Sequence, residues 1–210
     1  NSNIGIGYYS LNLNTTGYYN VAVGTSTLSS NTIGYGNTAF GHQAMYLNTT
    51  GIKGLAVGYQ ALYSNSTSSQ NTAIGYQSLQ NQSGGGSSIG IGVFSLNTSV
   101  TGIGNIGIGN SAGFTISNGQ YNTIIGTTAD VDASGAMHRI ALGNLANADT
   151  DYQFALPDDV VYWKIRGNSF TLPSADGSAK AVLQTDGSKV LSFGKVVYSD
   201  VYTPTLTNVT

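Results

Sequence analysis

The apolar and small residues of this chain recur with a fixed spacing of 17 positions. With Asn3 at position 1, nine consecutive units align as far as residue 155 without an insertion or a deletion. Self-similarity of this kind is typical of repeat architectures, in which each unit buries its apolar residues against its neighbours. We call each unit a coil and number its residues from position 1 to position 17.

Each coil opens on a segment that predicts a short strand. The first three coils read "NIGIG", "NVAVG" and "NTAFG", and position 4 is large and apolar in all nine coils. Because alternate residues of a strand share a face, positions 2 and 4 form a bulky face, whereas the Ala or Gly of position 3 forms a flat one. We expect the backbone of another chain to pack on the flat face. Position 5 is always Gly, which indicates a backbone conformation or close approach that a Cβ would obstruct.

A second apolar column lies at position 9, which is Leu or Met in the first six coils. We expect a second short strand there, followed by turns such as "NTTG" at Asn14 and Asn48. The apolar alternation has period two, and each Gly would cost a helix roughly 1 kcal/mol relative to Ala. The sequence therefore predicts an all-β protein, a parallel β-solenoid of nine coils and roughly 43 Å in length at about 4.8 Å per coil. The Asn at position 1 predicts a ladder of stacked amides.

Charge divides the chain near residue 130. Up to Ala129 the only ionised side chain is Lys53, and every other charge follows Ala129. We expect a solenoid over residues 1–155, a β-rich cap or adaptor over 156–198, and the start of a distal domain or a linker over 199–210. The chain thus reads as a segment of a longer protein.

The adaptor predicts two hairpins. The segment "VVYWKIRGNSFTL" alternates like a strand pair that turns at Gly167-Asn168, and "TDGS", at Thr185 to Ser188, separates "KAVLQ" from "KVLSF". We expect this module to cap the end of the solenoid, where unpaired strand edges would otherwise be exposed. Trp163, the single Trp, is interpreted as its core anchor.

Several function classes are disfavoured by composition. Charged residues are 8% of the chain and there is no Glu, so nucleic-acid binding is not expected. No apolar run has the 18 residues of a membrane span, and the lack of Cys excludes disulfides and thiolate metal sites. Because acid, base and nucleophile groups are scarce, we expect no enzyme, and we assign no catalytic, cofactor-binding or metal-binding residue and no cofactor.

The run "NTAIGYQSL", with its variants "NTAFGHQAM" and "GLAVGYQAL", resembles the shaft repeats of bacteriophage tail fibre proteins. It is also similar, with a longer period, to the head β-rolls of bacterial trimeric autotransporter adhesins. The resemblance covers residues 3 to about 155. Downstream, "FTLPSADGSAKAVLQTDGSKVLSFG" is similar to a segment that links such shafts to a distal domain, and "YTPTLTNVT" resembles that domain's first strand.

The resemblance implies a homotrimeric tail fibre shaft, part of the virion, that mediates host attachment by displaying a distal tip. The implied partners are further copies of the chain, other tail or baseplate proteins and, through the distal region, a host receptor of saccharide or outer-membrane character. The alternative is a trimeric adhesin head on a bacterial surface that binds host matrix or glycans. An ice-binding solenoid is weakly supported, because Thr occupies position 2 in only three coils. A polysaccharide-cleaving tailspike lacks carboxylates up to Ala129.

Four groups of residues are candidate sites. His42 and His138 lie five coils apart, roughly 24 Å along the rod, and are interpreted as separate surface residues. Asp132 and Asp149 share position 11, so they should lie about 5 Å apart in consecutive coils, with Asp130 and Asp151 nearby. Such carboxylates either recruit a cation such as Ca²⁺ or remain solvated turn residues.

The other two groups follow from composition. Three Asn residues, Asn14, Asn48 and Asn97, match the pattern of a glycan acceptor. Many Tyr residues could either stack on sugars or cover the coils. They include Tyr8, Tyr9, Tyr18, Tyr19, Tyr35, Tyr59, Tyr63 and Tyr76.

Overall fold

The structure is a computed structural model that describes residues 2–157, 162–165, 168–171, 181–185 and 191–195. The chain divides into two compact units, Asn1–Asp158 and Asp159–Thr210. The described residues contain strands and turns and no helix, so none of them forms a helix that could cross a lipid bilayer.

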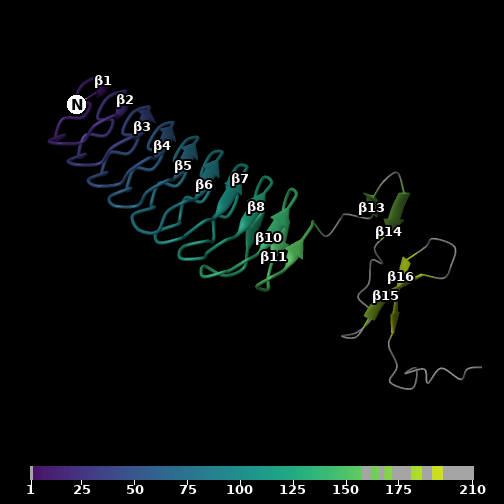
Figure 1. The fold of residues 1–210 in the computed structure, drawn as a ribbon. Helices are drawn as coiled ribbons and strands as arrows, with labels where there is room; N and C mark the ends of the chain where they lie inside the picture. Colours follow the sequence, from purple (N-terminus) through teal and green to yellow (C-terminus); the bar gives the residue numbers. More distant parts are fainter. Residues whose placement is uncertain (1, 158–161, 166–167, 172–180, 186–190, 196–210) are drawn as a thin grey trace, which may run out of the picture. The chain divides into compact units, whose positions relative to one another are not determined.

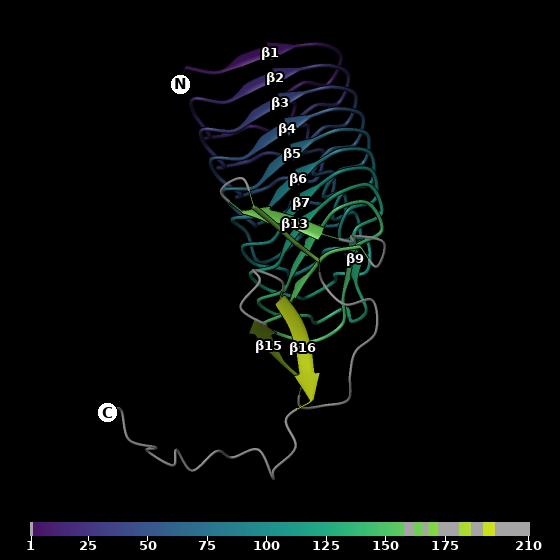
Figure 2. The ribbon, with the colours of Figure 1, turned by 90° about the vertical axis from the view of Figure 1, so that its right-hand side faces the viewer.

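The first unit is a parallel β-solenoid of nine coils, as the 17-residue spacing predicts (Figure 1). Each of the nine coils contributes one strand to a parallel sheet, and coil nine adds β12 as a tenth, so the order is β1-β2-β3-β4-β5-β6-β7-β8-β10-β12. Figure 2 shows these strands stacked along the unit. From β1 to β10 the register advances by one coil at each step. For example, Ala22 of β2 lies opposite Ala39 of β3. The sheet strands are β1 (Ile4–Ile6), β2 (Val21–Val23), β3 (Thr38–Phe40), β4 (Leu55–Val57), β5 (Thr72–Ile74), β6 (Ile89–Ile91), β7 (Ile106–Ile108), β8 (Thr123–Ile125), β10 (Ile140–Leu142) and β12 (Phe154–Ala155).

The flat face of the strand lies inside the coil, and the prediction that another chain packs on it is wrong. Position 3 is fully buried wherever it carries Ala, as in Ala56, while the larger neighbours Leu55 and Val57 lie partly exposed on the outer side. The interior is narrow because Leu at position 9 fills it. A Cβ added to Gly107 would lie 2.7 Å from Leu96 Cγ. Position 3 therefore holds no residue larger than Ala opposite such a leucine, and at Gly107 even a Cβ would be too close.

The exception at position 3 confirms this reading of the interior. Position 3 of the eighth coil is Ile124, which is fully buried. The coil before it carries Gly113 instead of Leu at position 9, and the buried Ile116 lies three residues further on. Ile124 and Ile116 thus supply the apolar volume that the missing leucine would have occupied.

The column at position 9 is buried as expected, but it is not a strand in the first seven coils. Leu28, Leu62 and Leu79 are fully buried and have φ values of 49° to 52°, so the backbone turns there instead of extending. Bonds between coils hold this conformation, as when Leu28 N–H donates to Ala44 O at 3.1 Å. A second strand pair forms only near the end, from β9 (Asp130–Val131) and β11 (Asn147–Ala148).

Glycine is required at position 5 by the spacing of the coils. At Gly75 φ is +136°, and an added Cβ would lie 2.6 Å from the carbonyl carbon of Gly92 in the next coil. Both the backbone conformation and the close approach exclude a side chain. The invariant Gly of the sequence therefore allows adjacent coils to approach closely.

The second unit contains two antiparallel strand pairs, as the alternation predicts. One joins β13 (Tyr162–Ile165) to β14 (Asn168–Thr171), with Trp163 opposite Phe170, and the other joins β15 (Ala181–Thr185) to β16 (Leu191–Lys195). The structure describes the backbone of Trp163 but not the surroundings of its side chain, so the core anchor and the cap stay predictions. The segment 199–210 lies outside the described residues.

Candidate functional site

The outer face of the ten-stranded sheet is the main candidate for an interaction surface. Positions 2 and 4 of each strand point outward and carry apolar residues or Thr along the whole solenoid. Ile74 is 36% exposed and Phe40 is 41% exposed, although neither lies at an end of the sheet. Contiguous apolar surface of this kind marks interaction sites in soluble proteins. We call positions 2 and 4 of the sheet strands the outer sheet face.

Position 6, just beyond the outer sheet face, carries a column of rings stacked on one another. Tyr59 stacks on His42 and on Tyr76, with ring centroids 5.3 and 5.1 Å apart. Because both faces of the middle ring are covered, this stack presents mainly ring edges outward. The geometry favours the interpretation that the tyrosines cover the coils over the interpretation that they offer ring faces to sugars. Further stacks join Tyr18 to Tyr35, Tyr46 to Tyr63, and Tyr121 to His138 and Tyr152.

The two histidines lie in separate stacks. His42 lies against Tyr59 in the middle of the solenoid, and His138 lies between Tyr121 and Tyr152 near its end. This agrees with the prediction that they are separate surface residues.

Buried asparagines join the coils from within. At position 1 the side-chain oxygen of Asn20 accepts the backbone N–H of Asn37 in the next coil at 3.0 Å, and its amide donates to Gly34 O at 2.8 Å. The predicted stacking of amides at position 1 is found once, where the amide of Asn122 donates to Asn105 at 3.0 Å, and the longer amide ladder lies at position 12. There Asn48 donates to Asn31 at 2.6 Å and accepts from Asn65 at 2.8 Å. The turn asparagines of the "NTTG" motif thus form the amide ladder.

Hydrogen bonds inside the coils also account for the three candidate glycan acceptors. The side-chain oxygen of Asn14 accepts the amide of Asn31 at 2.6 Å, and Asn48 is fully buried. Asn97 is 8% exposed and donates to Gln77 O at 2.9 Å. Their amides serve the coil interior, so the sequence pattern reflects the repeat and not a modification site.

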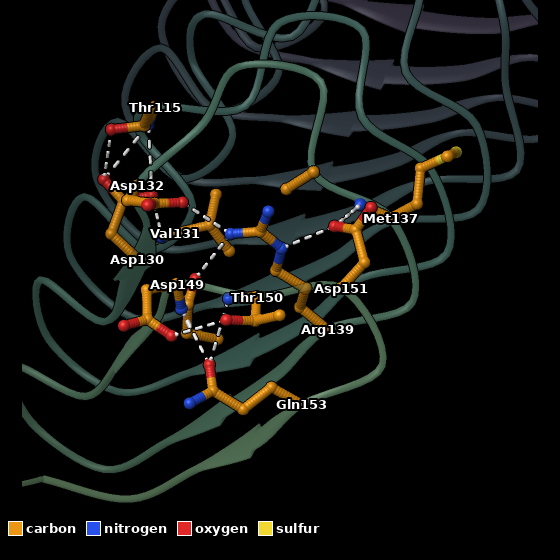
Figure 3. A network of polar contacts seen from close by, with 12 residues as sticks. Thr115, Asp130, Val131, Asp132, Met137, Arg139, Asp149, Thr150, Asp151 and Gln153 are labelled. Carbon is orange, nitrogen blue, oxygen red and sulfur yellow. Dashed lines mark hydrogen bonds and ion pairs between the residues drawn. The ribbon is translucent and has the colours of Figure 1, made fainter. Parts of the chain in front are cut away.

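Charge is concentrated where coils eight and nine meet (Figure 3). The guanidinium of Arg139 donates to Asp132 at 2.6 Å, to Asp151 at 2.7 Å and to Ala148 O at 2.8 Å. Its side chain is only 7% exposed. Sequence reasoning missed Arg139. The sequence feature that could have identified it is a cation at position 1, where six of the nine coils carry Asn.

The electrostatics of this cluster follow from its geometry. Burial opposes the charge of Arg139, but hydrogen bonds to Asp132 and Asp151 outweigh it, and the pKa of the guanidinium is raised. The backbone N–H of Met137, followed by Arg139, holds the pKa of Asp151 below its ordinary value. Burial raises the pKa of Asp130, against hydrogen bonds from Val131 and Thr115.

Asp132 and Asp149 occupy matching places in consecutive coils, as the 17-residue spacing predicts. Asn147 of β11 pairs with Asp130 of β9, and Asp149 and Asp132 each lie two residues further on. The two carboxylates nevertheless have different partners. Asp132 accepts from Arg139, whereas Asp149 accepts the hydroxyl of Thr150 at 3.0 Å. Among the described residues no group of three His, Cys, Asp or Glu could hold a metal ion. The geometry favours an ion pair over a cation site.

Comparisons of this chain with protein-family models, with curated proteins and with solved structures found no match.

Proposed function

We propose that this chain is a rigid, non-enzymatic shaft that assembles as a homotrimer through its outer sheet face and belongs to a bacteriophage tail fibre. In this role the solenoid supplies length and stiffness and holds a distal, receptor-binding region away from the particle. The resemblance of the "NTAIGYQSL" repeats to tail fibre shafts supports the viral part of the proposal.

The observation that carries the proposal is the outer sheet face itself. It is apolar, it runs the length of the solenoid, and from coil one to coil seven the only ionised side chain in the sequence is Lys53. An exposed apolar strip without charged residues favours a permanent apolar partner over water. Three copies around one axis would bury three such strips at once, and the closed symmetry would leave no strip uncovered.

Native mass spectrometry of the whole chain tests the assembly. We expect a particle of three times the 21.7 kDa chain mass at micromolar concentration. The double variant Ile91→Asp/Ile108→Asp places two charges on the outer sheet face and should give monomers that keep the β-solenoid circular dichroism. The matched control is Thr50→Asp/Thr67→Asp, which adds the same charges at exposed turn positions and should remain trimeric.

A monomeric unmodified chain, or a double variant that stays trimeric, would overturn the proposed assembly. Immunogold electron microscopy with an antibody against the solenoid tests the tail fibre. Label on the fibres of virions supports it, whereas label on the surface of uninfected bacteria supports the adhesin alternative.

A further inference from the structure

The ninth coil, residues 139–155, is joined to the solenoid differently from the coils before it. Where position 1 is Asn, as in Asn105, its side-chain oxygen accepts the backbone N–H of the next coil, here that of Asn122, at 3.0 Å. The backbone N–H of Arg139 donates such a bond to the side-chain oxygen of Asn122 at 3.0 Å, but the guanidinium of Arg139 has no acceptor with which to continue the pattern. The next strand also changes register, because Phe154 of β12, only 14 residues later, pairs with Ile140.

Arg139 replaces this neutral linkage with an ionic one (Figure 3). Arg139, Asp151 and Ala148 belong to coil nine and Asp132 belongs to coil eight, so the buried guanidinium holds two points of coil nine and links them to coil eight through Asp132. Asp151 also accepts the backbone N–H of Met137 at 3.0 Å, which is a second link between the two coils. The two ion pairs of Arg139, with Asp132 and Asp151, depend on ionised carboxylates.

Losing the carboxylate charges would leave the guanidinium buried without a counter-ion. Arg remains protonated at any pH at which the protein is folded. A buried charge that loses its partner strongly destabilises the fold. A neutral amide does not titrate, so its hydrogen bonds are unchanged on acidification. The sequence has no Asp or Glu before Asp130, so coils one to seven contain no carboxylate to protonate.

We propose that coil nine is an acid-sensitive latch, which is closed while Asp132 and Asp151 are ionised and which opens by itself when they are protonated. It is the last coil before the chain passes into the second unit at Asp159. Opening would lengthen that connection, whereas coils one to seven would keep their structure. The latch does not depend on the proposed homotrimer, because all of its contacts lie within one chain.

The direction of the pH effect follows from the groups around Arg139. The pKa of Asp151 is lowered in the folded chain, so its stabilisation is present above its ordinary value of 3.8 and is lost as the pH falls through the lower folded value. Asp130 has a raised pKa and acts in the opposite sense, but it bonds Thr115 and Val131 and not Arg139. The other charged groups nearby are Asp149, which bonds Thr150, and His138, whose charge lowers the pKa of Asp151.

Hydrogen–deuterium exchange of the whole chain at pH 6 and pH 3, corrected for intrinsic rates, tests the latch. At pH 3 we expect amides within 140–155 to exchange at least ten times faster relative to pH 6, while β3 to β6 are unchanged. The variant Asp132→Asn/Asp151→Asn should produce the same local opening at pH 6. Its control, Asp149→Asn, changes the neighbouring carboxylate of the same column and should stay closed.

Arg139→Asn is the decisive variant, because it restores the residue of six other coils and removes the buried charge. We expect its ninth coil to be protected equally at pH 3 and pH 6. The proposed latch would be contradicted if the amides of coil nine in the unmodified chain were as protected from exchange at pH 3 as at pH 6. Acid-sensitive exchange of coil nine in Arg139→Asn would contradict it as well. The protection of β3 to β6 distinguishes opening of the latch from general unfolding.

Discussion

Coils one to seven and coils eight and nine share one 17-residue spacing but are joined by different interactions. In the first region the asparagines of position 12 form the internal ladder of coils one to four, and Leu62 and its counterparts fill the interior. In the second region position 9 is Asp130 or Asn147, position 12 has no Asn, and Arg139 forms the buried polar link. The same strand path can therefore be held by amide ladders or by an ion pair.

The comparison also shows what both regions require. Position 5 is Gly in every coil, and the strand that precedes it keeps its small or buried residue at position 3. These features set how closely two coils approach. The polar groups inside the coil, by contrast, can be exchanged provided that each one keeps a partner. Among the described residues, no buried side-chain nitrogen or oxygen lacks a hydrogen bond.

Gly75→Val should have the largest effect on stability, because it replaces a position-5 glycine, which both regions require. The valine would be forced to φ near +136° and would overlap the Gly92 carbonyl. We expect a loss of about 3 to 5 kcal/mol in the free energy of unfolding, measured by circular dichroism in denaturant. Gly84→Ala is the matched control. Its Cβ would meet only Thr101 Cγ2, at an ordinary 3.5 Å, and a loss as large as that of Gly75→Val would contradict our account of position 5.

Asn48→Ala tests the neutral region alone and should have an intermediate effect. It removes the bond to Asn31 and one of the two acceptors of the Asn65 amide inside the coil, where only the bond to Ser68 O remains. A buried polar group left unsatisfied costs about 1–3 kcal/mol, and we expect a loss in that range that does not vary between pH 4 and pH 8. Gln70→Ala, at an exposed position, should change stability by less than about 0.5 kcal/mol. Equal losses for both variants would argue against the ladder.

High salt should produce the smallest effect, confined to the charged region. Raising NaCl from 0.1 to 1 M shortens the Debye length from about 10 to about 3 Å, but it screens partly buried pairs much less than exposed ones. We expect amides of coil nine to exchange up to about three times faster, whereas those of coils two to six do not respond. A uniform response of all coils would mean that the two regions are not held by different interactions.

Much of the fold could be predicted from the sequence because the spacing is regular. The nine strands, their order and the buried leucines of position 9 follow from the period and from apolar alternation. The second strand predicted at position 9 is wrong for the first seven coils, because Leu28 and its counterparts adopt positive φ values that leucine seldom adopts. Bonds to the next coil impose that conformation, and no local sequence rule contains them.

Some features of the candidate sites could also be predicted from the sequence, and others could not. The column shared by Asp132 and Asp149 was predictable from the 17-residue spacing. The role of Arg139 was not, because its partners lie 7 residues before it and 12 residues after it, at positions that face each other only once the coil is closed. The sequence marked Arg139 as unusual but could not tell which carboxylates it would meet.

The 17-residue spacing alone predicts a β-solenoid with a fixed period, with Gly at each position 5 and almost no charge before residue 130. Alternation states which residues share a face of a strand, but it does not state which face lies inside. Only the tertiary structure decided that the small residues of position 3 face inward and that the bulky residues of positions 2 and 4 face outward. The physical reason is volume, since a narrow coil already filled by leucine leaves room for little more than a methyl group.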